Sequence, residues 1–164
     1  MPLPDKPEHG TWPLAAGSAS PAGGSFDVIE ADDLLGIGAG SAILVADDDA
    51  SNRVAYEAAL APLGRDVVLV GSGVEALVTL LDRDVALILL DVQMPGMTGL
   101  DTARMLRDRP RNKATPIIFI TGMGWNSEIV REAYELGAFD FVVKPVEPEV
   151  LRAKVRLYLQ LQDR

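Results

Sequence analysis

The sequence predicts an α/β domain of the doubly wound type, in which helices cover both faces of a parallel sheet. Two observations predict it. From Ser41 onward, five short apolar runs alternate with five stretches of helical periodicity, which is typical of repeated βα units. Glycines also follow the first and fourth helical stretches, at Gly64 and Gly137, where helices commonly end.

The predicted strands are the apolar runs, taken in chain order. They span residues 42–46, 66–70, 85–90, 116–121 and 139–143. Because a helical stretch separates each from the next, consecutive strands are expected to run parallel. Five βα units of this kind form a (βα)5 flavodoxin-like sandwich, and the five-stranded sheet of that fold has the order 2-1-3-4-5.

The predicted helices lie between the strands and after the last one. They span residues 51–63, 73–82, 99–108, 126–136 and 148–162. In the fourth helix, Ile129, Ala133 and Leu136 form an apolar stripe, and charged residues occupy the opposite side. This pattern predicts a helix that packs one face on the sheet and exposes the other to water.

Composition limits the classes of function. The chain has 164 residues, 48% of them hydrophobic, and no cysteine, which excludes disulfides, thiolate metal sites and thiol catalysis. The single histidine, His9, lies outside the predicted domain. A formal charge of −9 argues against direct binding of nucleic acid, because contacts to phosphates require a basic surface. No apolar run has the length of a membrane span and no secretory signal pattern is present, so we expect no membrane contact and a cytoplasmic location.

Residues 1–40 differ in composition from the rest of the chain. The first two dozen are crowded with Pro, Gly, Ser and Ala, which predicts a flexible extension that cannot form a core. The extension is also acidic, since it has six carboxylates against Lys6. Within it, residues 26–30 read Phe-Asp-Val-Ile-Glu and are apolar enough to dock on the domain. We therefore expect an extension at 1–40 and a folded domain at 41–164.

Functional groups follow four of the predicted strands. Asp47 and Asp48 follow the first strand, Asp91 the third, Thr121 ends the fourth and Lys144 follows the fifth. In an open parallel sheet, ligands bind outside the carboxyl ends of the strands, and the first and third strands are neighbours there. Clustered carboxylates repel one another unless a cation joins them, and hard oxygen ligands favour Mg²⁺. Each residue alone has a simpler reading, such as a helix cap or a solvated charge, but together they predict one site.

The residue types in this site also predict a reaction. Asp91 could attack a phosphoryl group as a carboxylate nucleophile and form an aspartyl phosphate. Magnesium would bridge carboxylate and phosphoryl oxygens, and the ammonium of Lys144 would neutralise further charge.

Four linked motifs resemble the receiver domain of two-component response regulators. They occur in the order and near the spacing of that family, and the resemblance covers about residues 41–164. The motifs are Ile43-Leu44-Val45-Ala46-Asp47-Asp48-Asp49, the run from Leu89 to Leu100 with Asp91 and Met94-Pro95-Gly96, Ile118-Phe119-Ile120-Thr121-Gly122, and Phe141-Val142-Val143-Lys144-Pro145.

The resemblance implies a role for each site residue. Asp91 would accept the phosphoryl group; Asp48, Asp91 and the backbone carbonyl of Gln93 would bind Mg²⁺ directly, and Asp47 would bind it through a water. Thr121 would hydrogen-bond the phosphoryl group and Lys144 would pair with it. The Lys144–Pro145 peptide bond is cis in many relatives. Phe141 stands at the switch position, where Tyr is frequent, and Thr98 stands where relatives usually have Asp.

The resemblance implies a signalling domain that takes a phosphoryl group from a histidine kinase or phosphotransfer protein. Such a domain catalyses only its own phosphorylation and dephosphorylation and is not otherwise an enzyme. Phosphorylation would draw Thr121 inward, let Phe141 turn in, and remodel the face made by the fourth helix, fifth strand and fifth helix.

Two other functions match parts of the sequence less well. Asp47-x-Asp49-x-Ser51 is similar to the start of haloacid-dehalogenase-type phosphatases, in which Asp47 would be the nucleophile of a Mg²⁺-dependent enzyme. However, the later acidic motif and the cap insertion of those enzymes are missing. A flavin-binding electron carrier of the same fold lacks support, because acids replace the phosphate-binding loop after the first strand.

The last predicted helix has two apolar stripes. The first suits the sheet and comprises Leu151, Val155 and Tyr158. The second has roughly heptad spacing and comprises Val150, Leu157 and Leu161, with Lys154. Either the second stripe covers the core at the edge of the sheet, or it forms a homodimer contact; a homodimer could also use the whole face of the fourth helix, fifth strand and fifth helix.

Overall fold

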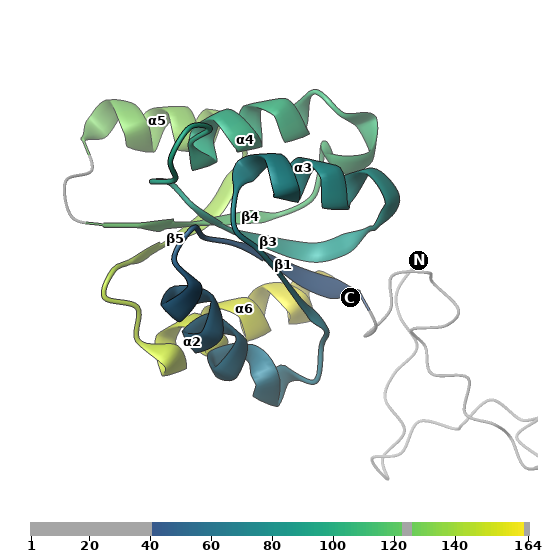
Figure 1. Ribbon diagram of the computed structural model, residues 1–164, viewed down its shortest axis with the longest axis vertical. Coiled ribbons are helices and arrows are strands. Elements are labelled where there is room, and N and C mark those ends of the chain that lie inside the picture. The colour runs from purple at the N-terminus through teal and green to yellow at the C-terminus, as the bar shows by residue number, and fades with distance from the viewer. Residues whose placement is uncertain (1–40, 123–125, 163–164) are drawn as a thin grey trace, which may run out of the picture.

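The computed structural model describes residues 41–122 and 126–162, so the predicted extension at 1–40 lies outside the described residues. The described chain forms one parallel sheet of five strands in the order β2-β1-β3-β4-β5, which confirms the predicted fold (Figure 1). The strands are β1 (Ala42–Ala46), β2 (Val67–Val70), β3 (Val85–Asp91), β4 (Ile117–Thr121) and β5 (Ala138–Val143).

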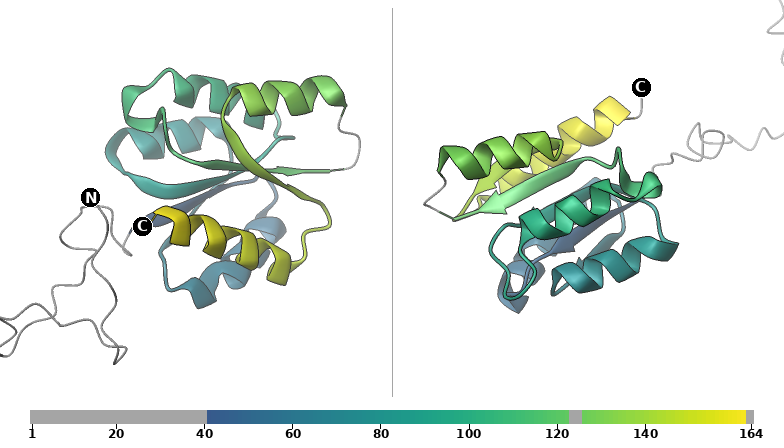
Figure 2. Two further views of the ribbon diagram at one scale, coloured as in Figure 1. Left: turned by 180° about the vertical axis from the view of Figure 1, so that it is seen from behind. Right: turned by 90° about the horizontal axis from the view of Figure 1, so that it is seen from above.

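Five α-helices connect the strands and cover both faces of the sheet. They are α2 (Ala50–Leu60), α3 (Gly73–Asp82), α4 (Gly99–Arg107), α5 (Ser127–Glu135) and α6 (Pro148–Gln162), with two short 3₁₀ helices, η1 (Ala61–Leu63) and η2 (Pro110–Asn112). Helices α3, α4 and α5 lie on one face, and α2 and α6 lie on the other, as both views in Figure 2 show.

The helix predicted at 51–63 is shorter than expected. The α-helix ends at Leu60, and the chain continues as the 3₁₀ helix η1. Pro62 has no N–H to donate to the preceding turn, so it cannot continue the α-helical hydrogen bonding. Gly64 then ends the segment with φ 71°, a left-handed conformation that favours glycine. The other predicted bounds differ from the structure by one residue at most.

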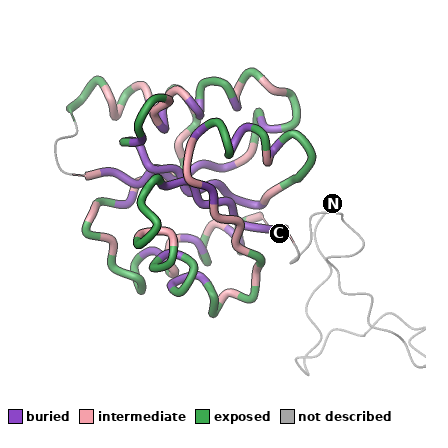
Figure 3. Tube along the Cα trace, viewed as in Figure 1, coloured by how far each residue is buried: buried purple, intermediate pink, exposed green. Residues whose placement is uncertain are grey.

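Alternate residues of the central strands fill two cores. On β1, Leu44 and Ala46 pack with the side chains of α3 and α4, whereas Ile43 and Val45 pack with those of α2 and α6. All residues of β1 and β4 are buried, as expected for a parallel sheet that has helices on both faces (Figure 3). This packing fixes the ends of β1, β3 and β4, from which the candidate site is built.

Within the described residues, no helix is both long and apolar enough to cross a membrane.

Candidate functional site

The carboxyl edge of the sheet brings the predicted site residues together. Asp91 is the last residue of β3 and Thr121 the last of β4, while Asp47 and Lys144 directly follow β1 and β5. Strands β1 and β3 are paired neighbours, and the pairing runs as far as Ala46 and Leu90. The side chains that follow these two strands therefore meet at one point on the edge.

Three carboxylates form the centre of the site. Oxygen atoms of Asp47, Asp48 and Asp91 lie within 4.8 Å of one another. Asp47 and Asp91 are buried and Asp48 is exposed. Three negative charges at this separation repel one another, and two of them have lost most of their contact with water, so a cation placed among them would be bound favourably.

Lys144 supplies a positive charge at this cluster. Its Nζ donates to Asp91 Oδ2 over 2.7 Å and lies 3.9 Å from Asp47 Oδ2. The backbone also holds the lysine in place, because Lys144 N donates to the carbonyl of Thr121 over 2.7 Å. The following Lys144–Pro145 peptide bond is cis, as the resemblance implied.

The protonation behaviour of these groups reflects their burial and their mutual charges. Burial raises the pKa of Asp47, and the charge of Asp91 adds to this, although the N–H of Asp49 donates to Asp47 Oδ1 and acts in the opposite direction. Burial alone would lower the pKa of Lys144. The hydrogen bond to Asp91 and the nearby carboxylates outweigh it and raise that pKa, so the lysine stays charged.

The second oxygen of Asp91 is held by the loop that follows β3. Gln93 N donates to Asp91 Oδ1 over 2.9 Å, so both carboxylate oxygens have a donor. The start of α4 can lie this close to β3 only because Gly99 has no side chain: a Cβ there would come within 2.2 Å of the Asp91 carbonyl oxygen. Thr98, the departure from the resembled pattern, caps α4, since its Oγ1 accepts from Asp101 N.

The two predicted switch residues lie on neighbouring strands, Thr121 at the end of β4 and Phe141 on β5. Thr121 is buried, and its Oγ1 donates to the carbonyl of Gly122 over 3.1 Å. The half-buried ring of Phe141 stacks on Phe119, with centroids 6.2 Å apart, and meets Tyr134 edge-on at 5.2 Å. The predicted switch residue is therefore packed between a core ring and an exposed one.

Two side chains near Asp47 were not predicted from the sequence. Asn52 Nδ2 donates to Asp47 Oδ2 over 3.3 Å. Burial raises the pKa of the Tyr56 hydroxyl, and the charges of Asp47 and Asp91 raise it further, so this tyrosine stays protonated. Both residues lie on α2 four positions apart, and this helical spacing directly after an acidic strand end is the signal that could have identified them.

Asp49, the third acid after β1, is a helix cap. Its carboxylate caps α2 by accepting from Ser51 N and Asn52 N. An open hollow of about 560 Å³ lies beside Asp48. It is lined mainly by apolar side chains of the loop after β3, together with Ile129 of α5.

Comparison with known sequences identifies the family. The response regulator receiver domain matches residues 43–156. The DNA-binding response regulator MtrA of Mycobacterium leprae is 36% identical over 121 residues, which are 74% of this chain and 52% of that protein. The cyclic di-GMP phosphodiesterase response regulator RpfG of Xanthomonas campestris is 37% identical over 123 residues, 74% of this chain and 32% of that protein. The chain therefore spans about half the length of the first of these curated relatives and less of the second.

Solved structures agree with this assignment. The chemotaxis protein CheY4 of Vibrio cholerae superimposes with a TM-score of 0.68 at 29% identity, over 73% of this chain and 98% of that one. A response regulator receiver protein from Pseudomonas putida superimposes with a TM-score of 0.65 at 30% identity, over 74% of this chain and 97% of that one. Nothing in these comparisons supports a haloacid-dehalogenase-type phosphatase with Asp47 as nucleophile. The chain belongs to the response regulator receiver domain family, whose members act in phosphorelay signalling.

Proposed function

We propose that this chain accepts a phosphoryl group on Asp91 from a histidine kinase or phosphotransfer protein. The observation that carries the proposal is the environment of Asp91. Its buried carboxylate ends a strand, lies beside two further carboxylates, and has Lys144 Nζ 2.7 Å from one oxygen. Such an arrangement places a nucleophile next to groups that can neutralise an incoming phosphoryl group.

The transfer step is a displacement at phosphorus. A carboxylate oxygen of Asp91 forms the new P–O bond while the P–N bond to the donor imidazole breaks, and the leaving nitrogen keeps the electron pair and then takes up a proton. Lys144 pairs with the phosphoryl oxygens. Thr121, at the end of the neighbouring strand, donates its hydroxyl to one of them.

The donor set of the site fits magnesium. Among the described residues, the clustered side chains that could hold a metal there are the carboxylates of Asp47, Asp48 and Asp91, and hard oxygen ligands favour Mg²⁺ over softer metals. Asp48, Asp91 and the backbone carbonyl of Gln93 would hold the ion directly, and Asp47 would hold it through a water. The bound ion supplies a positive charge that neutralises the negative charge of the phosphoryl group during transfer.

Phosphorylation would then be communicated to the face formed by α5, β5 and α6. Drawing the hydroxyl of Thr121 toward the phosphoryl group changes the space next to Phe141, whose ring packs on Phe119 and Tyr134. A rotation of this ring alters the surface beside Tyr134. Because Phe141 has no hydroxyl, its signal to a partner comes from packing and not from a hydrogen bond.

Further features of the function stay predictions. The domain would act as a phosphoacceptor in the cytoplasm, away from membranes, and would turn over only its own aspartyl phosphate. Exposed Val150, Leu157 and Leu161 on α6 match the predicted second stripe, which supports a homodimer through α6 or through the face of α5, β5 and α6. The expected lack of nucleic-acid contact is not supported by the relatives, since those named MtrA are DNA-binding regulators, about half of whose length is matched by this chain.

Incubation with acetyl phosphate and Mg²⁺ tests the proposal. We expect a transient adduct that hydroxylamine removes, and no adduct in the Asp91→Asn variant. Asp66→Asn, at the opposite end of the sheet, is the matched control and should label like the unaltered chain. Labelling that persists in Asp91→Asn would show that another residue is the acceptor. Sustained release of phosphate from added phosphoesters would instead favour a phosphatase.

A further inference from the structure

The strand β2 has one edge that no other strand covers within the described residues. It is the outermost strand of the sheet and pairs with β1 on its inner side. On that side the carbonyls of Asp66 and Val70 accept from Ile43 N and Asp47 N, over 2.8 and 3.1 Å. Peptide groups alternate along a strand, so the N–H and C=O groups of Val67 and Leu69 point away from β1.

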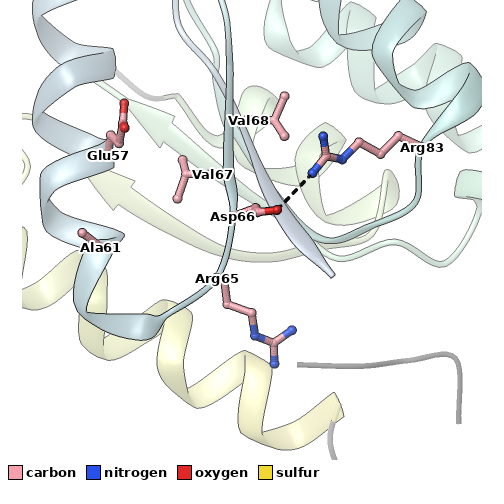
Figure 4. Close-up of a pocket in the computed structure, with 7 residues that line it drawn as sticks. All are labelled: Glu57, Ala61, Arg65, Asp66, Val67, Val68 and Arg83. Atoms are coloured by element: carbon pink, nitrogen blue, oxygen red, sulfur yellow. Dashed lines mark ion pairs between the residues drawn. The ribbon is translucent and has the colours of Figure 1, made fainter. Parts of the chain in front are cut away.

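The outer side of β2 is also hollowed. A recess of about 450 Å³ runs along the start of this strand, between α2 and the residue that follows α3 (Figure 4). Val67 and Val68 supply its apolar part. Arg65 and Arg83 also line it, and Arg83 Nη2 is 3.7 Å from Asp66 Oδ2.

An uncovered edge of this kind is a template for another strand. Its outward N–H and C=O groups can pair with any extended chain, and natural proteins usually cover or block such edges. The half-buried side chains of Val67, Val68 and Leu69 add apolar surface on both faces of the strand. A short, partly apolar strand with acidic residues near the arginines would therefore be complementary to this edge.

The sequence before the domain contains such a segment. Residues 26–30, Phe-Asp-Val-Ile-Glu, combine an aromatic and two β-branched residues, which favour strands. Asp32 and Asp33 follow directly. Ten residues, 31–40, connect the segment to Ser41 and can span about 33 Å, whereas the four residues of β2 extend over about 13 Å.

The point where the chain enters the domain lies beside the recess. Arg65 Nη1 donates to the carbonyl of Ser41 over 3.5 Å, and Arg65 also lines the recess. A segment that runs antiparallel to β2 ends at this same end of the sheet, so the connection to β1 is short. In that orientation Glu30, Asp32 and Asp33 come next to Arg65 and Arg83.

We propose that residues 26–30 pair antiparallel with the outer edge of β2 and add a sixth strand to the sheet. The segment covers Val67 and Leu69 and places its acidic end against the two arginines. Because segment and edge belong to one chain, the pairing is favoured by an effective concentration on the order of millimolar.

Amide hydrogen exchange of the full-length chain, followed by NMR, tests this pairing. The amides of Val67 and Leu69 face outward and would be protected only by the added strand, whereas those of Val68 and Val70 face β1 and serve as internal references. In the double variant Val28→Pro and Ile29→Pro, which removes two N–H groups from the segment, we expect Val67 and Leu69 to exchange at least about tenfold faster. The matched control Ala19→Pro should leave all four rates unchanged.

Three results would overturn the proposal. The first is exchange of Val67 and Leu69 at unprotected rates in the unaltered chain. The second is protection that survives the double proline variant. The third is protection that grows with protein concentration, because it would assign the edge of β2 to a second copy of the chain.

Discussion

The two edges of the sheet use charge in opposite ways. At the carboxyl edge, Asp47, Asp48 and Asp91 share one ammonium group, that of Lys144. At the amino edge, guanidinium groups bind backbone carbonyls. Arg107 donates to three carbonyls, those of Leu136, Asn112 and Thr115, over 2.6, 2.9 and 2.7 Å. Arg109 and Arg111 donate to one carbonyl each, those of Leu77 and Leu81, both over 2.7 Å.

This difference separates stability from function. A backbone carbonyl is a permanent neutral acceptor, so an arginine that binds several carbonyls joins segments in every state of the protein. The amino edge therefore holds α4, η2 and the start of β5 together. The carboxyl edge keeps an excess of negative charge, which costs stability but favours a partner that can arrive and leave. Substitutions at the carboxyl edge should therefore change phosphorylation while the fold persists, whereas substitutions at the amino edge should lower stability and leave phosphorylation unchanged.

The largest effect is expected for Asp91→Asn. This change removes the nucleophile, so labelling by acetyl phosphate should fall below detection. It also removes one of three clustered negative charges, and we expect the free energy of unfolding without Mg²⁺ to rise by about 1 kcal/mol. Thermal unfolding and labelling of the same sample measure both outcomes. A lower melting temperature would mean that the carboxyl edge stabilises the fold and would remove the contrast between the edges.

Arg107→Met is the corresponding change at the amino edge. It leaves several half-buried carbonyls without a donor, so we expect the free energy of unfolding to fall by about 3 kcal/mol while the folded fraction still labels at the usual rate. Urea unfolding and acetyl phosphate labelling provide the measurements. Arg109→Met is the matched control, because Arg109 donates to a single described carbonyl, and it should cost about 1 kcal/mol. Equal losses in the two variants would contradict a special role for Arg107.

Lys144→Met tests the cation that pairs with Asp91 at the acidic edge. Without the ammonium group, the charge of the incoming phosphoryl group is less well neutralised, and labelling should slow about a hundredfold. Removal of the lysine also removes the positive charge that offsets the repulsion among the three carboxylates, but the fold should persist. Lys113→Met, an exposed lysine at the amino edge, should label like the unaltered chain. An unchanged labelling rate in Lys144→Met would show that the lysine has no part in phosphoryl transfer.

The sequence predicted the carboxyl edge better than the amino edge, for a physical reason. In a parallel sheet all strands end at the same edge, so the order of the motifs alone was enough to bring Asp47, Asp91, Thr121 and Lys144 together. The amino edge depends on carbonyls that lie up to 32 residues from their arginine, as for Arg109 and Leu77. Every residue has a carbonyl, so these acceptors leave no signal in the sequence.

Local details were predictable only in part. The glycine after the first helix marked its end, but Pro62 stopped the α-helix one turn earlier than the apolar pattern indicated. The contact of Asn52 with Asp47 depends on the direction in which α2 leaves the strand, which the residue pattern alone does not specify. The second apolar stripe of α6 was predicted, but its residue pattern left open whether it covers the core or forms a homodimer contact; in the structure Val150, Leu157 and Leu161 are exposed.

The smallest effect is expected for a charged group away from both edges, Asp140. Its carboxylate accepts from Lys154 over 2.9 Å and from Tyr158 over 3.1 Å, and thereby ties β5 to α6. Burial alone would raise the pKa of Asp140, but these donors and the N–H of Phe141 outweigh burial and lower it below its ordinary value of 3.8. A carboxyl whose pKa is lowered by folding stabilises the protein above the unfolded value and loses that contribution as the pH falls through the folded value.

Asp140→Asn should therefore lower the free energy of unfolding by about 1 kcal/mol or less at pH 7, with no effect on labelling. The difference from the unaltered chain should shrink as the pH falls below 3.8, where Asp140 takes up a proton in the folded protein as well. Urea unfolding at pH 7 and below pH 3.8 measures this change, with Asp108→Asn at the exposed end of α4 as control. A difference that stays constant with pH would assign the contribution of Asp140 to packing. A slower labelling rate would instead connect this pair to the acidic edge through Phe141, whose N–H also donates to Asp140 over 2.7 Å.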